Sequence, residues 1–313
     1  MTLSIGVSMA ISRFFSAKET SKGFQKIKES QLNAIEFGLL NCVLGRSNIP
    51  GTIPYPSEKQ SKSIRETTPP EKCYTSIHGP YRISATSEDP KKLQYSKSNL
   101  SKSLLIADWI GARHVTFHSG SFKRKHNNQH VQKILKEWEN WRQHKEYKAK
   151  LAPEVGGKYN SFADFFTLVE IAGTIDNCLI TWDISHDFAR GGNLTTEEGV
   201  LNRLELLDKT FVLNNENRLP VHFSGIVVGK AGEKQHTLLD HGTGVPWKLV
   251  FSVLKEQNYL GKLNLICESK VPKGEKLTGG AISDAVHARE FLESEQLIKT
   301  YKGKPGHLDY YFK

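Results

Sequence analysis

Short runs of apolar residues alternate along the chain with longer polar segments in which apolar residues recur at a helical spacing. The short runs have the length and bulk of buried strands. Eight of them occur, at residues 3–9, 33–37, 74–77, 114–117, 149–153, 178–182, 219–221 and 263–267. Helices are predicted between them, at residues 17–28, 92–109, about 131–148, 162–171, 195–209, 247–256 and 284–297. This alternation predicts an α/β protein with a parallel sheet.

Six of the eight predicted strands are followed directly by a histidine, an aspartate or a glutamate. These residues are His78, His118, Glu154, Asp183, His222 and Glu268. Successive members lie 29 to 46 residues apart, and a (β/α)8 barrel uses roughly 30 to 40 residues for each strand and helix. We therefore predict a (β/α)8 TIM barrel with a metal site at the C-terminal face of the strands. A doubly wound sheet is the alternative fold, but it would spread these residues along one edge, and no glycine-rich phosphate loop supports it.

The 313 residues suffice for one barrel with insertions, so we expect a single domain over residues 1–313. Residues 45–70 are rich in proline and glycine and are predicted to form a mobile surface loop. A polar loop is predicted at residues 229–244, and a short basic tail at the end of the chain.

The chain carries 43 basic and 33 acidic residues and a formal net charge of +10. This balance suits a polyanionic partner such as nucleic acid. The four cysteines form no CxxC pair and are expected to be reduced thiols of an intracellular protein. No segment approaches the roughly 20 consecutive apolar residues of a membrane span, and the first 15 residues lack the pattern of a signal peptide. We therefore expect a cytoplasmic protein without a membrane partner.

Further metal-binding residue types adjoin the strand ends. His186 follows Asp183 by three residues, and Glu233 and His236 lie in the predicted polar loop. The mixed set exceeds what one tetrahedral zinc ion needs, so two or three metal ions are predicted, with a carboxylate bridging a pair. Such ions polarise a phosphate, activate water and stabilise a leaving oxygen, which together suit phosphodiester hydrolysis. Glu36, inside the second strand, is interpreted as an ordinary solvated or salt-bridged carboxylate.

Short motifs surround the strand-end residues. They are His78-Gly79-Pro80-Tyr81, Phe117-His118-Ser119-Gly120-Ser121, Pro153-Glu154 with Gly157-Lys158, Asp183-Ile184-Ser185-His186, His222-Phe223-Ser224 and Glu268-Ser269. As an ordered set, from about residue 5 to residue 288, the chain resembles the endonuclease IV family of apurinic/apyrimidinic endonucleases, and its archaeal-type members most. The resemblance implies a zinc-dependent DNA repair endonuclease that hydrolyses double-stranded DNA 5′ to abasic sites and leaves a 3′-hydroxyl. We expect it to act as a monomer.

The resemblance also implies three zinc sites, two of them bridged by Glu154. The first would use His78, His118 and Glu154, the second Glu154, Asp183, His222 and Glu268, and the third His186, Glu233 and His236. Of these, Glu154, Asp183 and Glu268 would be the catalytic residues. Mn²⁺ or Fe²⁺ are alternatives to Zn²⁺ at ligands of this kind.

The sequence departs from the family pattern at three places. Ser119 replaces the proline after the histidine, and Val155 replaces the polar residue after the glutamate. In the last loop the bacterial members have Asp-x-His, whereas this chain has Glu233-Lys234-Gln235-His236, with the histidine one residue late. A site with two metal ions is the alternative.

Four residues are candidates for DNA contact. By the resemblance, Tyr81 and Arg82 would be inserted into the DNA where the abasic sugar is extruded. Lys123 and Arg124 would contact backbone phosphates. The alternative interpretation is a capping aromatic residue, a solvated arginine and a solvated basic loop.

Other functions are possible on the same barrel. A metal-dependent sugar isomerase or epimerase needs fewer histidines and no basic surface. A UV-damage endonuclease-like enzyme would need a deeper pocket for a two-base lesion. A non-catalytic DNA-binding protein would not need the complete set of six strand-end residues.

Overall fold

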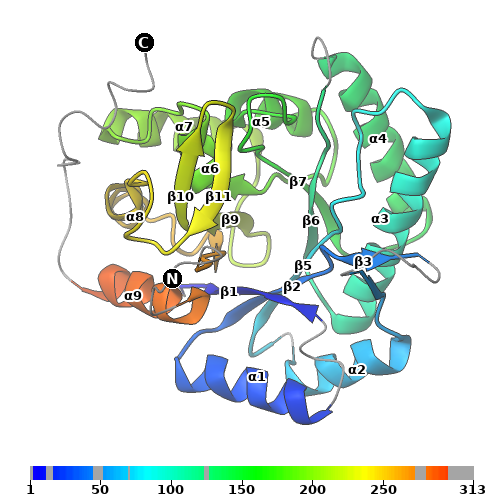
Figure 1. Cartoon of the computed structure of the whole chain (residues 1–313), viewed down its shortest axis with the longest axis horizontal. Helices are drawn as coiled ribbons and strands as arrows, with labels where there is room; N and C mark the ends of the chain where they lie inside the picture. The colour runs from blue at the N-terminus through cyan, green and yellow to red at the C-terminus, as the bar shows by residue number, and fades with distance from the viewer. Residues whose placement is uncertain are drawn as a thin grey trace.

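A barrel of eight strands forms the centre of the molecule (Figure 1). The computed structural model describes residues 3–11, 17–44, 52–69, 71–122, 127–271 and 280–294. The barrel strands are β1 (Ile5–Ala10), β2 (Ala34–Gly38), β5 (Tyr74–His78), β6 (His114–His118), β7 (Lys150–Glu154), β8 (Trp182–Asp183), β9 (Leu219–Phe223) and β12 (Leu263–Cys267). The predicted (β/α)8 barrel is thereby confirmed.

All paired barrel strands are parallel, in the order β7-β6-β5-β2-β1-β12-β9-β8. The barrel closes where its two end strands, β7 and β8, come together, at the residues just before β8. There Thr181 donates its N–H to the carbonyl of Pro153 at 2.9 Å and accepts the N–H of Val155 at 3.0 Å. The strand predicted at residues 178–182 is therefore reduced to β8, and the residues before it join β7 through an isolated bridge between Glu154 and Thr181.

The helices pack around the outside of the barrel strands, except the short α6 (Ile184–Ala189), which lies at the barrel mouth against β8 and β9 (Figure 1). They are α1 (Ala17–Glu29), α2 (Glu58–Thr67), α3 (Pro90–Ile110), α4 (Asn128–His144), α5 (Phe165–Gly173), α6 (Ile184–Ala189), α7 (Glu197–Thr210), α8 (Trp247–Glu256) and α9 (Ala281–Glu293). Local signals set their ends. Asp89 caps the start of α3 by accepting the N–H of Lys91, and Gly111, at φ 84°, ends it in the left-handed region. Asp164 accepts the N–H of Thr167, so α5 begins three residues later than predicted.

The prediction of a mobile loop at residues 45–70 is wrong for the part that the structure describes. Residues 52–69 contain β4 (Ile53–Pro54), which pairs with β3 (Cys42–Val43), and the helix α2. Ser57 and Gln60 form a capping box at the start of α2, and Ile64 is fully buried. The helix was missed because its sequence is mostly polar. Residues 45–51 and 70 lie outside the described residues.

The polar loop predicted at residues 229–244 is also wrong in part. Residues 225–237 form an antiparallel hairpin of β10 (Gly225–Gly229) and β11 (Gly232–Thr237), which contacts α6. The strand β11 was missed because four consecutive polar residues hide the alternation that marks a half-buried strand. This hairpin brings residues of the last loop to the barrel mouth.

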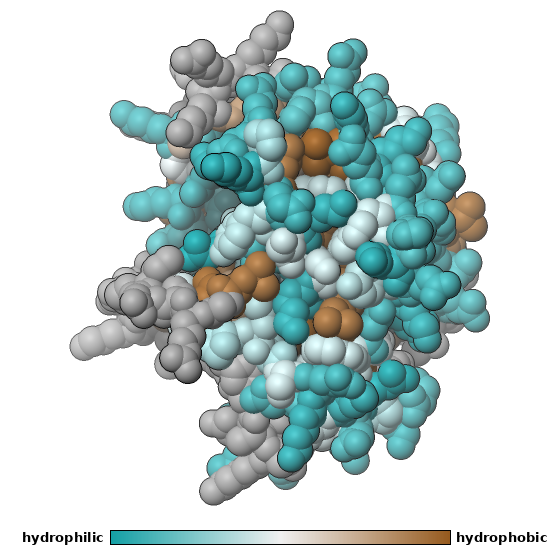
Figure 2. All heavy atoms as spheres, turned by 90° about the vertical axis from the view of Figure 1, so that its right-hand side faces the viewer, coloured by the Kyte–Doolittle hydropathy of each residue, from teal (hydrophilic) through white to brown (hydrophobic). Residues whose placement is uncertain are grey.

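The face of the molecule over α3 and α4 is mostly hydrophilic, with separate small apolar patches (Figure 2). None of the helices within the described ranges is both long and apolar enough to cross a membrane. The predicted basic tail lies outside the described residues, as does the end of the helix predicted at residues 284–297.

Candidate metal centre

The barrel strands carry all six predicted strand-end residues to one mouth of the barrel. His78, His118, Glu154 and Asp183 are the last residues of their strands, His222 is the penultimate residue of β9, and Glu268 directly follows β12. All except His118 are buried. Their ligand atoms fall into groups in which every atom lies within 4.8 Å of the others, which is close enough to share a metal ion. Parallel strands place their C-terminal ends together, and this is why residues far apart in sequence meet here.

The first group consists of His78, His118 and Glu154. Oε2 of Glu154 lies 3.2 Å from Nε2 of His78 and 3.0 Å from Nδ1 of His118. Nδ1 of His78 lies 2.9 Å from the carbonyl oxygen of Gly79, which can only accept a hydrogen bond. Nδ1 of His78 therefore carries a proton, and Nε2, which faces the carboxylate and donates to it, is the nitrogen that could exchange its proton for a metal ion.

The second group consists of Glu154, Asp183, His222 and Glu268. Nδ1 of His222 lies 3.1 Å from Oε1 of Glu154 and 3.6 Å from Oε2 of Glu268. Oδ1 of Asp183 caps α6 by accepting the N–H of His186 at 2.8 Å. Oδ2 of Asp183 is buried and has no hydrogen-bond partner among the residues that the structure describes. A buried carboxylate oxygen without a donor is costly, so this group fits a cation.

The third group consists of Asp183, His186 and His236. Nε2 of His186 and Nε2 of His236 face each other at 3.0 Å. Glu233 lies beside both, with carboxylate oxygens 3.5 Å from Nε2 of His186 and 3.8 Å from Nε2 of His236. Glu233 and His236 therefore both reach His186, whereas the sequence alone left the position of the loop histidine open.

Hydrogen bonds show where these two histidines hold their protons. Nδ1 of His186 donates to the carbonyl of Val155 at 3.0 Å. Ser185 gives its hydroxyl proton to the carbonyl of Ser224, and Ser224 gives its own to Ser185. Oγ of Ser224 must then accept from Nδ1 of His236 at 2.9 Å. Both Nε2 atoms are left with lone pairs that point at each other, and only a shared proton or a metal ion relieves this repulsion.

The charges of the cluster are strongly coupled. Burial would lower the pKa of His78 and His186, but the hydrogen bond of His78 to Glu154 and the carboxylate of Asp183 beside His186 raise both to about 9. Burial, and then the neighbouring charge of His186, lowers the pKa of His236 to about 4. One of the two facing imidazoles is thus charged and the other neutral. A metal ion in this position would replace the shared proton.

The pKa values of two carboxylates in the cluster, Glu154 and Asp183, are shifted in opposite directions. Burial would raise the pKa of Glu154, but His118, His222 and His78 hold it well below its usual range. Burial raises the pKa of Asp183 to about 6. The charge of His186 opposes this rise, and the charge of Glu154 adds to it. The site thus stabilises the negative charge of Glu154, the residue that the first and second ligand groups share.

The cluster opens into a cavity of about 640 Å³. Its lining includes His118, His186, Glu233 and His236 as well as Tyr81. The ring of Tyr81 is stacked on that of His118, with centroids 5.4 Å apart and planes inclined by 7°, and Tyr81 is 58% exposed. The aromatic ring therefore lies at the mouth of the site, in contact with a member of the first group.

Of the other three candidates for DNA contact, the structure describes only Arg82. Arg82 is half-buried next to Tyr81. Lys123 and Arg124 lie outside the described residues, so their predicted contacts with phosphates are not tested. The change to Val155 leaves the site intact, because its backbone carbonyl supports His186.

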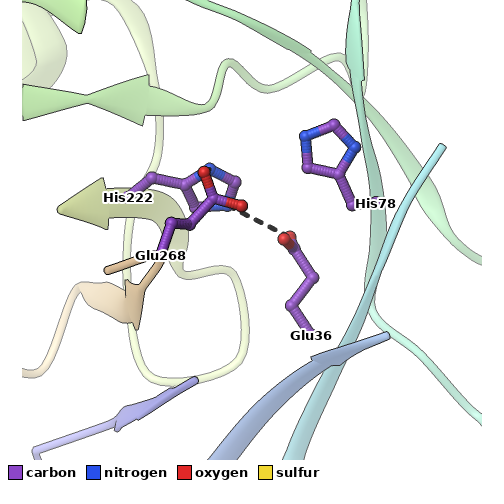
Figure 3. A group of neighbouring side chains, drawn as sticks. All are labelled: Glu36, His78, His222 and Glu268. Carbon is purple, nitrogen blue, oxygen red and sulfur yellow. Dashed lines mark hydrogen bonds and ion pairs between the residues drawn. The ribbon is translucent and has the colours of Figure 1, made fainter. Parts of the chain in front are cut away.

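Of the two interpretations of Glu36, the solvated carboxylate is wrong, whereas the salt-bridged one agrees with its ion pair to His222. It is fully buried, and its Oε2 lies 3.1 Å from Nε2 of His222. It forms a further group with His78, His222 and Glu268 (Figure 3). The signal in the sequence was a charged residue between Ile35 and Phe37 in an apolar strand, but it does not stand at the strand end.

The fold and these clusters agree with the comparisons to known proteins. The chain belongs to the xylose isomerase-like TIM barrel family, whose model matches residues 24–295. With its buried groups of histidines and carboxylates, it is a metal-dependent enzyme of that superfamily. An uncharacterised protein of Methanocaldococcus jannaschii is 24% identical over 262 residues, which cover 81% of this chain and 88% of that protein.

Solved structures of several activities share the fold. The IolI protein with a bound zinc atom matches with a TM-score of 0.66 at 16% identity, over 96% of this chain and 100% of that one. Endonuclease IV from Thermus thermophilus matches with 0.62 at 17% identity, over 92% and 98%. L-ribulose 3-epimerase matches with 0.61 at 14% identity, over 93% of each. These likenesses show the fold, and the reaction has to be argued from the site.

Proposed function

We propose that the protein is a metal-dependent DNA repair endonuclease that hydrolyses the phosphodiester bond 5′ to abasic sites and leaves a 3′-hydroxyl. The observation that carries the proposal is the third ligand group, in which His186 and His236 face each other beyond the groups that share Glu154. One metal ion suffices for the movement of a proton on a sugar. Three adjacent ligand groups suit a reaction in which charge develops on several phosphate oxygens.

The donor set fits borderline divalent cations. Imidazole nitrogens and carboxylate oxygens are the ligands of Zn²⁺ in catalytic sites, and they also bind Mn²⁺ and Fe²⁺. Bound ions would polarise the phosphate, activate the attacking water and stabilise the leaving oxygen. The protein supplies the orientation: Gly79, Val155 and Ser224 hold the protons of three histidines away from the cavity.

The mouth of the site suits an abasic nucleotide. Such a nucleotide has no base to unstack and is therefore the least costly to extrude from the duplex. The exposed ring of Tyr81 is available to stack on a base next to the gap, and the net charge of +10 favours a polyanion. Abasic double-stranded DNA is the partner that combines these requirements.

The direct test is incubation with a duplex that carries one tetrahydrofuran abasic analogue. The analogue cannot undergo β-elimination, so any cut must be hydrolytic. We expect a single cut 5′ to the analogue, with a 3′-hydroxyl end, that is lost after prolonged chelation and restored by added zinc. Elemental analysis should find two to three metal ions per chain, and the undamaged duplex of the same sequence is the control.

Failure to cut, together with a single metal ion per chain, would contradict the proposal. The group of Glu154, Asp183, His222 and Glu268 would then act alone, as in a one-metal enzyme. A sugar isomerase or epimerase is the second candidate, and ketose sugars are the substrates to test.

Tyr81→Ala is expected to weaken binding to the abasic duplex by roughly tenfold to a hundredfold, the usual effect of a lost aromatic stack on nucleic acid. Binding to undamaged duplex should change little, because no gap is filled there. Fluorescence anisotropy with both duplexes measures the two affinities. Tyr81→Phe is the matched control, since it keeps the ring. An equal loss on both duplexes would reduce Tyr81 to a packing role against His118.

A further inference from the structure

A fourth carboxylate lies at the floor of the metal centre. Glu36 lies in the middle of β2, two residues before the end of that strand, and none of its surface is exposed. Its side chain extends from β2 toward His222 and Glu268, which come from β9 and the end of β12, the two strands beyond β1 in the barrel (Figure 3). Unlike the six predicted residues, Glu36 does not stand at the end of its strand. Its side chain therefore reaches the site from one layer deeper in the barrel.

The contacts of His222 assign different tasks to its two nitrogens. Nδ1 faces Glu154 at 3.1 Å and Glu268 at 3.6 Å, which are both members of the second ligand group. Nε2 faces only Oε2 of Glu36, at 3.1 Å, among the contacts within the described ranges. Glu154, Glu268 and Nδ1 of His222 would therefore hold a metal ion together. The remaining proton of the ring would then be on Nε2 and would be donated to Glu36.

We propose that Glu36 is a positioning residue that holds the proton of His222 on Nε2 and so presents the lone pair of Nδ1 to the metal ion. A carboxylate that accepts the second N–H of a metal-binding histidine fixes its tautomer and ring orientation and increases its basicity. The other histidines of the centre use neutral acceptors for this purpose: Gly79 for His78, and Val155 for His186. Of these three, His222 is the one whose hydrogen-bond acceptor is a carboxylate, although Nδ1 of His186 also lies 3.4 Å from Oδ2 of Asp183.

Direct binding of a metal ion by Glu36 is the competing arrangement. Its Oε1 has no hydrogen-bond partner in the described part of the chain, and its ligand atoms group with those of His78, His222 and Glu268. That arrangement would need Nε2 of His222 as the ligand and would leave Nδ1 protonated between two carboxylates of the second group. It would also draw Nε2 of His78 away from Glu154, which lies 3.2 Å from it. If Glu36 only positions His222, Nδ1 of His222 and Nε2 of His78 both stay next to Glu154.

The test is a zinc-binding titration in competition with a chromophoric chelator, on the full-length chain. Glu36→Ala is expected to weaken one zinc-binding step by roughly ten- to a hundredfold, the usual effect of losing such a partner. The number of zinc ions bound at saturation should stay unchanged. Glu36→Gln should recover most of the affinity, because an amide oxygen still accepts the N–H. Glu139→Gln is the control, since Glu139 is equally buried but pairs with Arg142 on α4, away from the centre.

Two outcomes would overturn the proposal: unchanged zinc affinity in Glu36→Ala, or the loss of one bound zinc in both Glu36 variants, which would make Glu36 a ligand. If Glu36→Ala does not fold, ¹⁵N NMR of the histidine rings in the zinc-loaded wild type and Glu36→Gln decides the question. The signals of His222 are identified as those that disappear in the His222→Ala variant. We expect them to show a proton on Nε2, and a proton on Nδ1 would refute the inference.

The inference rests on the metal centre of the proposed function. Zinc binding is measured without DNA, so a failed cleavage assay would leave this result standing.

Discussion

Glu154→Ala is expected to abolish the metal-dependent cleavage of abasic DNA. The carboxylate of Glu154 contacts His78 and His118 through Oε2 and His222 through Oε1, so its loss disrupts two ligand groups at once. Metal ions contribute several kcal/mol of transition-state stabilisation, so we expect a loss of about a thousandfold or more in the rate of cleavage. Single-turnover cleavage of the tetrahydrofuran duplex, with saturating enzyme and added zinc, measures the effect.

The control for this prediction is Glu139→Gln, which alters a buried carboxylate outside the centre. It should retain near-normal cleavage per folded molecule, although it loses an ion pair with Arg142. Circular dichroism should show that Glu154→Ala keeps the secondary structure of the wild type. Near-normal activity of a folded Glu154→Ala protein would contradict the shared role of this residue.

His236→Ala is expected to remove one metal ion per chain and to reduce cleavage by roughly a hundredfold, which corresponds to about 2.7 kcal/mol of lost transition-state stabilisation. The physical reason is that Nε2 of His186 then lacks its facing partner at 3.0 Å. Elemental analysis after gel filtration measures the metal content, and the tetrahydrofuran duplex reports the activity.

Gln235→Ala provides the matched control, because Gln235 stands at the position where the bacterial pattern of the resembled family has its histidine. It should change neither metal content nor cleavage appreciably. The reverse result, with Gln235→Ala impaired and His236→Ala active, would show that the register of the hairpin is different in solution. Equal metal content in wild type and His236→Ala would support a site with two ions.

The barrel was predictable because its signals are local and repeated. Apolar runs with the length of strands alternate with amphipathic segments, and each parallel strand ends at the same face. For this reason the spacing of residues such as His78 and Glu268 in the sequence predicted that they would meet. The structure brings them together, and their role as ligands stays a prediction until metal binding is measured.

The elements that were missed have a common cause. The helix α2 and the strand β11 bury few apolar side chains, so the periodicity of hydrophobic residues does not mark them. Their conformations depend on a capping box in one case and on cross-strand pairing in the other. Glu36 was missed because a carboxylate in the middle of a strand is compatible with a simple salt bridge, and only its buried contact with His222 reveals its location.

By itself, the sequence determined the barrel and the set of six residues at the strand ends, because strand order and side-chain direction follow from the alternation of elements. Only the tertiary structure decided which residues of the last loop reach the site. In a regular strand Glu233 and His236 would point to opposite faces, since they are three positions apart and successive side chains alternate. The pairing of β10 with β11 shifts register between Val227 and Val228, which face Gln235 and Glu233, so Lys234 is the extra residue of a bulge. The bulge turns Glu233 and His236 to the same face, toward His186.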